Sequence, residues 1–446
     1  MKPSSKDIAR LFLPMLLMLM PVLIFSGCKY KGAPNSVIEK TFPNGFKVIL
    51  KENHASPMIA SIVMVNAGSK FENDATNGFT HLLEHLNFDG TSTKSRIDIN
   101  EGIKNHGGYI NAFTRKDATT YLILMPSEFI DFGLDIQSDQ LFGSTFPEDE
   151  FEKERQVVTE EIRKDYDDLN YRVEMFNDSL VFASTPYART VLGSPKSIAE
   201  VSRQAVIDYY KSQYTPEKML AIAIGDFNPD SMLALYQKYF GSRPRGTQSR
   251  EVQINYSFPA SGQIHYRQTD TKVSTITITY PAPDFRSKDY YAFEMLTMIL
   301  NANETSPLYK ALTEGEKPLI QSLSVSLDTK TEFTNMVVSA MTDDAANADE
   351  ILKITNKSLQ DMTSQTIDPE ELNRFIVKAK VDEYLLEERL HYWGIIKAPY
   401  LAVGGYGFVK SYIDNLSAVT PEEVRKAAAT NLSDLKYIAT AVVPNT

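Results

Sequence analysis

Residues 81–85 read His81-Leu82-Leu83-Glu84-His85, and the rest of the fold can be worked out from this stretch. On a helix, at roughly 100° per residue, His85 lies about 40° from His81 and Glu84 about 60° to the other side. All three side chains therefore point the same way, whereas the two leucines point toward a packed core. One face of this helix is suited to hold a zinc ion while the other anchors the helix.

A second helix is predicted over about residues 148–165, and it offers further carboxylates. A catalytic zinc ion usually takes three protein ligands, so two histidines require one more. Glu154 and Glu161 are seven residues apart, which is two helical turns, and they share a face, while Glu160 is turned about 100° away from Glu161. Pro147 and the acidic residues after it suit a first helical turn. The apolar side of this helix is expected to consist of Phe151, Val157, Val158 and Ile162.

Together these residues resemble the M16 metallopeptidases, the family of pitrilysin, insulysin and the mitochondrial processing peptidases. The inverted motif H-x-x-E-H is followed, after about seventy-five residues, by E-R-x-V-x-x-E-E-I. The resemblance covers nearly the whole chain after its first residues and is stronger in the first half. It also includes Asn66–Ser69 before Glu72, the run His81–Thr91, and Gly107–Thr114 followed by Asp117–Tyr121.

The resemblance implies a role for each residue of the site. It makes His81, His85 and Glu161 the ligands of Zn²⁺, and Glu84 the general base. Zinc lowers the pKa of a bound water toward about 7 and polarises the scissile carbonyl, while a neighbouring carboxylate accepts the proton. Glu154 is then expected to support the site by orienting one of the ligands.

The segment Gly108–Thr114 resembles the exposed edge strand of the same family. An extended peptide can pair with such a strand through main-chain hydrogen bonds. We therefore expect Asn111, Ala112 and Phe113 to bind the substrate, with Asn111 near the scissile bond. The alternative interpretation is that the glycines before this segment mark only a hairpin.

Composition limits the class of protein. The chain has 446 residues, of which 43% are hydrophobic and 23% charged, so it can build two domains with proper cores. Its net charge is −11, and no run rich in Lys and Arg is interleaved with aromatic residues. Both features argue against a nucleic-acid partner.

The first residues read as an export signal. A basic start, with Lys2, Lys6 and Arg10, precedes an apolar stretch, Leu11–Phe25, that is short for a membrane span. Residues 25–28, Phe-Ser-Gly-Cys, resemble a bacterial lipobox, in which Cys28 carries the lipid.

Cys28 is the only cysteine of the chain, so it has no partner for an intramolecular disulfide, and a role as an acyl anchor explains it. An uncleaved signal anchor is the alternative. The expected segments are a lipoprotein signal peptide, 1–27, and a tether, 28–36. Lys29 resembles the residue found after the lipidated Cys in lipoproteins sorted to an outer membrane, so we expect an envelope protein anchored there, facing the periplasm or the surface.

The pattern of elements predicts an α+β fold of two homologous domains, each a mostly antiparallel sheet with helices packed on one face. The clearest linker is 241–252, which is polar and rich in Gly, Pro and Ser. It separates an expected catalytic zinc-binding domain, 37–240, from a second domain, 253–446, that echoes the first. The first half is expected to contain strands at 37–42, 46–50, 58–66 and 119–125, the helix with the H-x-x-E-H motif, and helices around 127–141 and 148–165. In the second half a strand is expected at 274–280, helices at 290–300 and from 369, and a turn between helices at 404–407.

The second domain lacks the zinc-binding residues. Where H-x-x-E-H would recur, the helix reads Glu294-Met-Leu-Thr-Met298. The resemblance implies that the metal-free half lines the other side of a closed cavity. In some members of the family this half also supplies an Arg and Tyr pair that holds the substrate carbonyl. Ser306–Tyr309 resembles the S-x-L-Y of that pair, but no arginine occurs between Arg286 and Arg374.

This gap suggests that a partner completes the site. We expect a dimer with a paralogue that supplies the Arg and Tyr; the alternatives are a homodimer and Lys330 in the role of the arginine. The favoured function is a zinc endopeptidase acting on peptides or unfolded segments. A non-catalytic assembly subunit of the same fold is the alternative, against which the intact Glu84 and Glu161 argue. A lyase resembling the S-ribosylhomocysteine lyases would need a cysteine ligand, and Cys28 cannot serve.

Overall fold

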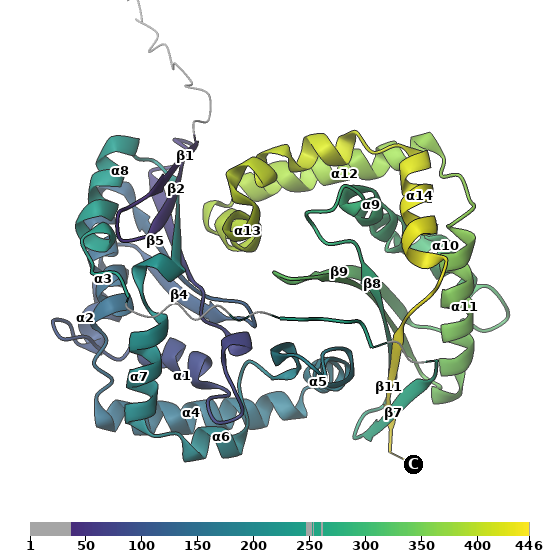
Figure 1. Cartoon of the computed structure of the whole chain (residues 1–446), viewed down its shortest axis with the longest axis horizontal. Helices are drawn as coiled ribbons and strands as arrows, with labels where there is room; N and C mark the ends of the chain where they lie inside the picture. The colour runs from purple at the N-terminus through teal and green to yellow at the C-terminus, as the bar shows by residue number, and fades with distance from the viewer. Residues whose placement is uncertain (1–36, 247–251, 253, 260–261, 446) are drawn as a thin grey trace, which may run out of the picture. The chain divides into compact units, whose positions relative to one another are not determined.

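The strands of the first half form one sheet with a short strand, β4, at its edge. A computed structural model describes residues 37–246, 252, 254–259 and 262–445. The strand order is β1-β2-β6-β3-β5-β4, and every neighbouring pair is antiparallel except β2 and β6 (Figure 1). The strands are β1 (Val37–Thr41), β2 (Lys47–Glu52), β3 (Met58–Val65), β4 (Tyr109–Thr114), β5 (Thr119–Pro126) and β6 (Met219–Gly225).

The second sheet repeats the order of the last five strands, β2-β6-β3-β5-β4, and has no counterpart of β1. It runs β7-β11-β8-β10-β9, and its one parallel pair, β7 with β11, stands where β2 and β6 stand in the first sheet. The predicted second copy of the fold is therefore confirmed, as is the mostly antiparallel pairing. The strands are β7 (Ile264–Thr269), β8 (Ser274–Ala282), β9 (Ser322–Thr329), β10 (Thr334–Thr342) and β11 (Ile438–Pro444).

Every helix that the sequence predicted is present, with shifts of a few residues at its ends, and the structure adds several that were not predicted. The helices of the first half are α1 (Phe79–Leu86), α2 (Arg96–Asn105), α3 (Ile130–Gly143), α4 (Glu148–Asp167), α5 (Leu169–Val181), α6 (Pro195–Glu200), α7 (Arg203–Gln213) and α8 (Pro229–Tyr236). In the second half they are α9 (Tyr290–Leu300), α10 (Pro307–Thr313), α11 (Ala348–Asp361), α12 (Pro369–Glu387), α13 (Leu390–Ser417) and α14 (Pro421–Leu432). Among the described residues, no helix is both long enough and apolar enough to span a bilayer.

The helices of the first half pack on one face of the first sheet, as predicted, and α13 of the second half covers the other face. On β3, Ile59 and Val63 belong to the core beneath α1 and α4, whereas Ile62 packs with Trp393 and Leu401 of α13. Strand residues alternate between faces, so a strand that is apolar throughout needs a cover on each side. Gly394 allows α13 to come close, because a Cβ there would stand 2.0 Å from Ile62 Cδ1.

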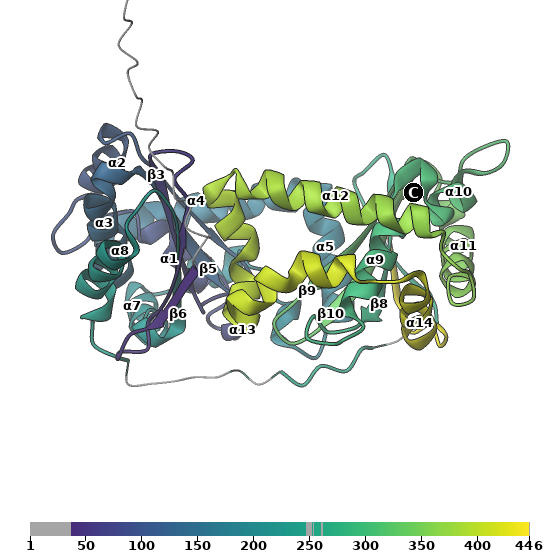
Figure 2. The same ribbon diagram turned by 90° about the horizontal axis from the view of Figure 1, so that it is seen from above.

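The turn between helices expected at 404–407 corresponds to a kink inside α13, at which two helical stretches meet. Helix α13 runs through it and is kinked at Gly405, whose φ of 66° and ψ of −176° are not helical. A glycine adopts this conformation without the steric cost that a Cβ would add. The two helical stretches therefore join directly, and α12 and α13 lie side by side (Figure 2).

Several expectations lie outside the described residues. They concern the signal peptide 1–27, Cys28, the tether 28–36 and, within the linker, residues 247–251 and 253. The strands of the two sheets nevertheless fall on either side of 241–252.

Candidate metal centre

Helix α1 carries the H-x-x-E-H motif and is fixed at both its start and its apolar face. The buried carboxylate of Glu72 accepts hydrogen bonds from the backbone N–H of Gly78 at 2.8 Å and of Thr80 at 2.7 Å, groups that a helix start otherwise leaves unpaired. Burial raises the pKa of Glu72, although these hydrogen bonds oppose the shift. Gly78 has a φ of 94°, and a Cβ there would stand 2.7 Å from the carbonyl oxygen of Leu192.

Helix α4 packs against α1 and brings its own carboxylates to it. Leu82 and Leu83 of α1 and Val158 of α4 are fully buried in the same core, as the helical period predicts. The inclusion of Val157 in the apolar side of α4 was wrong, because its side chain is 49% exposed. Adjacent residues on a helix point about 100° apart, and on α4 Val158 faces the core whereas Val157 points toward solvent.

The two histidines of α1 and Glu161 of α4 converge. Glu161 Oε2 lies 3.4 Å from His85 Nε2 and 3.8 Å from His81 Nε2. Ligand atoms of all three side chains lie within 4.8 Å of one another, and within the described part of the chain they form the one such group of three His, Cys, Asp or Glu residues.

This donor set fits zinc. Three ligands at the usual zinc bond lengths of about 2.0–2.2 Å stand a little over 3 Å apart in a tetrahedral site, which is close to the spacing found here. Two imidazole nitrogens and one carboxylate oxygen are ligands typical of a catalytic zinc ion. Sequence reasoning thus predicted a group of residues that the fold does bring together.

Glu84 lies beside this group and does not join it. Its Oε2 accepts a 2.6 Å hydrogen bond from Thr114 Oγ1 at the end of β4. Burial raises the pKa of Glu84, with the hydrogen bond from Thr114 acting in the opposite direction. A carboxylate whose pKa is raised toward neutrality is better suited to accept and release a proton.

Glu154 contacts the far side of one histidine, where a supporting residue was expected. Its Oε2 lies 3.0 Å from His85 Nδ1, so Nε2 of that ring is left to face Glu161. Burial lowers the pKa of His85, but hydrogen bonds to Glu154 and Glu161 outweigh it and raise the pKa to about 10. The hydrogen bond with His85 in turn lowers the pKa of Glu154.

His81 has a different environment. Burial, and then the proximity of His85, lower its pKa to about 4, so its ring is neutral at pH 7, the form that binds a metal. Its Nδ1 is buried without a hydrogen-bond partner. Only one of the two imidazoles is therefore held from behind.

Two residues near the site were missed by sequence reasoning. Arg96 Nη1 lies 3.0 Å from Glu154 Oε1 and 2.7 Å from Asp89 Oδ1. Asp89 lies within the run His81–Thr91 that carries the resemblance, but no role was assigned to it, and Arg96 lies outside every motif that was singled out.

The metal centre opens onto a cavity of about 390 Å³. Ala112, Phe113 and Thr114 of β4 line it, whereas Asn111, although expected near the scissile bond, is exposed on β4 and is not part of the lining. The remaining lining residues are His81, Glu84, Lys116, Glu161, Asp165, Tyr171, Glu174, Met175, Asp178 and the loop 188–192.

The second half places its candidate residues elsewhere. Lys330 Nζ forms a 2.7 Å ion pair with Asp328 and does not line the cavity, and neither does Tyr309. Ser306 instead caps α10 by accepting a hydrogen bond from the backbone N–H of Tyr309. On α9, Glu294 accepts a 2.8 Å hydrogen bond from Tyr412 in place of any metal-binding contact.

Two family models match the chain. "Insulinase (Peptidase family M16)" matches residues 47–194, which hold the metal centre, and "Peptidase M16 inactive domain" matches residues 200–376.

Among curated relatives, the chain is similar to an uncharacterized zinc protease of Bacillus subtilis, with 33% identity over 45% of this chain and 49% of the relative. It is also similar to the beta subunit of the mitochondrial-processing peptidase of Caenorhabditis elegans, with 32% identity over 50% of this chain and 49% of that protein. These matches span about half the length of each relative. A match to an uncharacterized zinc protease of Mycobacterium leprae, at 27% identity, covers 92% of both chains.

Solved structures share the fold. A protease from Helicobacter pylori superimposes with a TM-score of 0.83 and 21% identity, over 92% of this chain and 100% of that one. A peptidase M16 inactive domain from Pseudomonas fluorescens superimposes with a TM-score of 0.81 and 17% identity, over 92% and 98%. Sequence identities this low support a shared architecture and nothing more.

Proposed function

Since the chain belongs to the M16 family of peptidases, we propose that it is a zinc-dependent endopeptidase that cleaves peptides or unfolded protein segments inside a cavity. One observation carries the proposal. Ligand atoms of His81, His85 and Glu161 converge, and His81 and Glu161 line a cavity together with the half-buried Glu84. Such a wall offers metal ligands and a proton acceptor to the same bound peptide.

Each residue has a defined task. His81, His85 and Glu161 would hold the zinc ion. Zinc, when bound, lowers the pKa of water and polarises a peptide carbonyl. Glu84 takes the proton of the attacking water and delivers it to the leaving amine, and Thr114 holds that carboxylate in place through its hydrogen bond.

The edge strand supplies a place for the substrate. β4 pairs with β5 on one side only, so its other edge leaves main-chain groups available to an extended peptide. Ala112 and Phe113 lie where this strand lines the cavity. Main-chain pairing accepts many sequences, which suits a peptidase for unfolded segments.

The main experiment compares zinc content and cleavage of a quenched fluorescent peptide library for the purified chain and its Glu84→Gln variant. We expect the variant to keep one zinc ion per chain and to lose at least 10²-fold in turnover, the scale of general-base catalysis. Glu160→Gln is the matched control, because Glu160 is exposed on α4 and paired with Arg163. Equal turnover of wild type and Glu84→Gln, or absence of zinc from both, would reject the proposal and favour the non-catalytic assembly subunit.

We further propose a dimer, in which a paralogue supplies the Arg and Tyr that hold the substrate carbonyl. The basis is the lack of arginine between Arg286 and Arg374 and the position of Lys330 outside the cavity lining. Losing one donor to a developing oxyanion costs roughly 10²–10³ in kcat. The single chain is therefore expected to turn over slowly and to be stimulated by the paralogue, and full turnover alone would reject the partner.

The lipid anchor is proposed from the sequence around Cys28. A Cys28→Ser variant is expected to lose incorporation of labelled palmitate and to leave the membrane fraction of a bacterial host. Unchanged labelling and fractionation would favour the uncleaved signal anchor.

A further inference from the structure

A chain of contacts leads away from the metal centre through Glu154. One carboxylate oxygen of Glu154 is bound to His85 Nδ1, and the other lies 3.0 Å from Arg96 Nη1. The same Nη1 lies 2.7 Å from Asp89 Oδ1 and 3.5 Å from Glu150 Oε2. Arg96 thus connects Asp89, in the loop after α1, to the carboxylates of α4.

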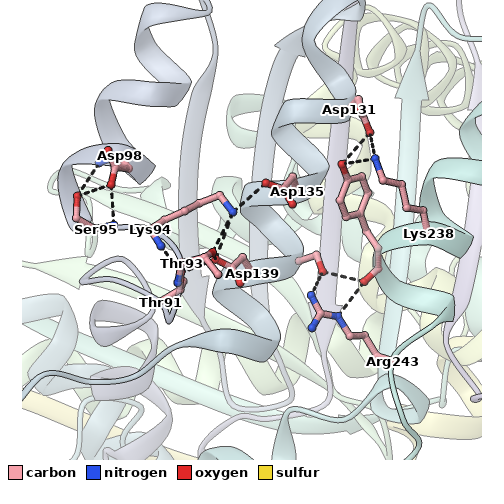
Figure 3. A network of polar contacts seen from close by, with 12 residues as sticks. Thr91, Thr93, Lys94, Ser95, Asp98, Asp131, Asp135, Asp139, Lys238 and Arg243 are labelled. Atoms are coloured by element: carbon pink, nitrogen blue, oxygen red, sulfur yellow. Dashed lines mark hydrogen bonds and ion pairs between the residues drawn. The ribbon is translucent and has the colours of Figure 1, made fainter.

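The loop that presents Arg96 is held in place by its neighbours. Thr91, Thr93 and Lys94 all contact Asp139 of α3, and Lys94 Nζ also lies 2.8 Å from Asp135 (Figure 3). Ser95 and Asp98 form a reciprocal capping box at the start of α2, so Arg96 is the first residue of a well-capped helix (Figure 3). The guanidinium is therefore presented from a fixed backbone.

The surroundings of Arg96 are acidic. The side chain of Asp89 is 1% exposed, and its Oδ2 is buried without a hydrogen-bond partner. Among the described residues, Arg96 is the only Lys or Arg that forms an ion pair with Asp89 or with Glu154. Without this cation, two buried carboxylates would repel each other, and the hydrogen bond with His85 alone would hold Glu154 in place.

We infer that Arg96, itself held by Asp89, is a positioning residue that fixes Glu154 against His85 and thereby tightens the binding of zinc. This inference rests on the proposed function only in taking His81, His85 and Glu161 as zinc ligands. Groups that orient a metal-bound imidazole from behind commonly contribute 10–100-fold to metal affinity. The effect should be large here, because His81 Nδ1 has no such support.

The test measures zinc affinity of the metal-free full chain by competition with a chromophoric chelator. We expect Arg96→Met to weaken zinc binding by roughly 10–100-fold. Arg96→Lys should recover part of this loss, because an ammonium group restores the charge without the planar fork. Arg163→Met is the matched control; it removes the same charge from an exposed α4 residue paired with Glu160, and its affinity should stay within about twofold of wild type.

A double-mutant cycle separates positioning from a general effect of charge. If Arg96 acts through Glu154, the double variant Arg96→Met with Glu154→Gln should bind zinc no more weakly than Glu154→Gln alone. Losses that multiply in the double variant, or wild-type affinity in Arg96→Met, would overturn the inference. Asp89→Asn removes the charge that holds Arg96 but keeps Arg96 itself, and it replaces Arg96→Met in the test if that variant does not fold. We expect Asp89→Asn to bind zinc several-fold more weakly than wild type.

The outcomes distinguish this inference from the proposed function. If the wild-type chain binds zinc and Arg96→Met binds it with equal affinity, the inference is rejected and the peptidase proposal stands. Weakened binding in Arg96→Met together with no peptidase activity in wild type supports the inference and rejects the activity. Wild-type chain that binds no zinc rejects both.

Discussion

Thr114 Oγ1 donates a 2.6 Å hydrogen bond to Glu84 Oε2, and it thereby links the edge strand β4 to the helix that carries the metal ligands. The two residues are 30 positions apart, and two further residues of the same strand line the cavity. This hydrogen bond therefore fixes the position of the proposed substrate-binding strand relative to the carboxylate that is proposed to take a proton from the attacking water.

This contact predicts the effect of Thr114→Val. The substitution keeps the shape of the side chain and removes the donor, and hydrogen bonds to charged groups contribute about 1.5–3 kcal/mol. We expect kcat to fall by roughly 10- to 100-fold while zinc stoichiometry stays at wild-type level. Tyr109→Phe, on the exposed start of β4, is the control and should leave kcat unchanged. A Thr114→Val enzyme with wild-type kcat would show that this hydrogen bond does not matter for turnover.

Metal removal should destabilise the first half of the chain. The proposed ligands come from α1 and α4, so bound zinc would link the two helices. Free zinc at 100 times its Kd adds about 2.7 kcal/mol to the free energy of unfolding. A chelator is expected to lower the thermal midpoint of wild type. The measurement is a thermal melt with and without chelator. His81→Ala should melt at one temperature under both conditions; a shift in that variant would mean that the ion binds elsewhere.

The stability of the second half should depend on pH through Glu294. Burial raises the pKa of Glu294 to about 7, against the hydrogen bond from Tyr412. The native state therefore holds a proton that the unfolded chain releases near pH 4.5, so stability falls as the pH rises from about 4.5 through 7.

Glu294→Gln removes this dependence and keeps an oxygen for Tyr412. Its advantage in unfolding free energy over wild type is expected to grow by about 3 kcal/mol between pH 4.5 and pH 8. Urea unfolding at the two pH values measures it, with the exposed Glu316→Gln as control. An advantage that does not change with pH would contradict the burial of a titrating carboxylate.

Glu72 should matter for the stability of the helix that carries the motif. Glu72→Ala leaves the N–H groups of Gly78 and Thr80 unpaired, and each unsatisfied buried group costs about 1–3 kcal/mol. We expect the unfolding free energy to drop by about 2–4 kcal/mol. Asp74→Ala, nearby in the same loop but exposed, should change it by less than about 1 kcal/mol. Equal stability of the two variants would show that the cap does not hold α1.

Much of the site was predictable because its spacing is local. The helical period places His81, Glu84 and His85 on one face and the leucines on the other, and it gives Glu154 and Glu161 a common face. The same reasoning failed for Val157, where an apolar residue was assigned to the core by its type and not by its angle.

The sequence by itself determined which side chains share a helix face and that the second half repeats the first without its ligands, because these features depend on neighbours a few residues apart. Only the tertiary structure decided that Arg96 and Asp89 stand behind Glu154, that α13 covers the second face of the first sheet, and that Asn111 lies outside the cavity lining. The contact of Arg96 with Glu154 and the packing of α13 on the first sheet join residues distant in the chain, and such packing is set by the whole core rather than by any local period.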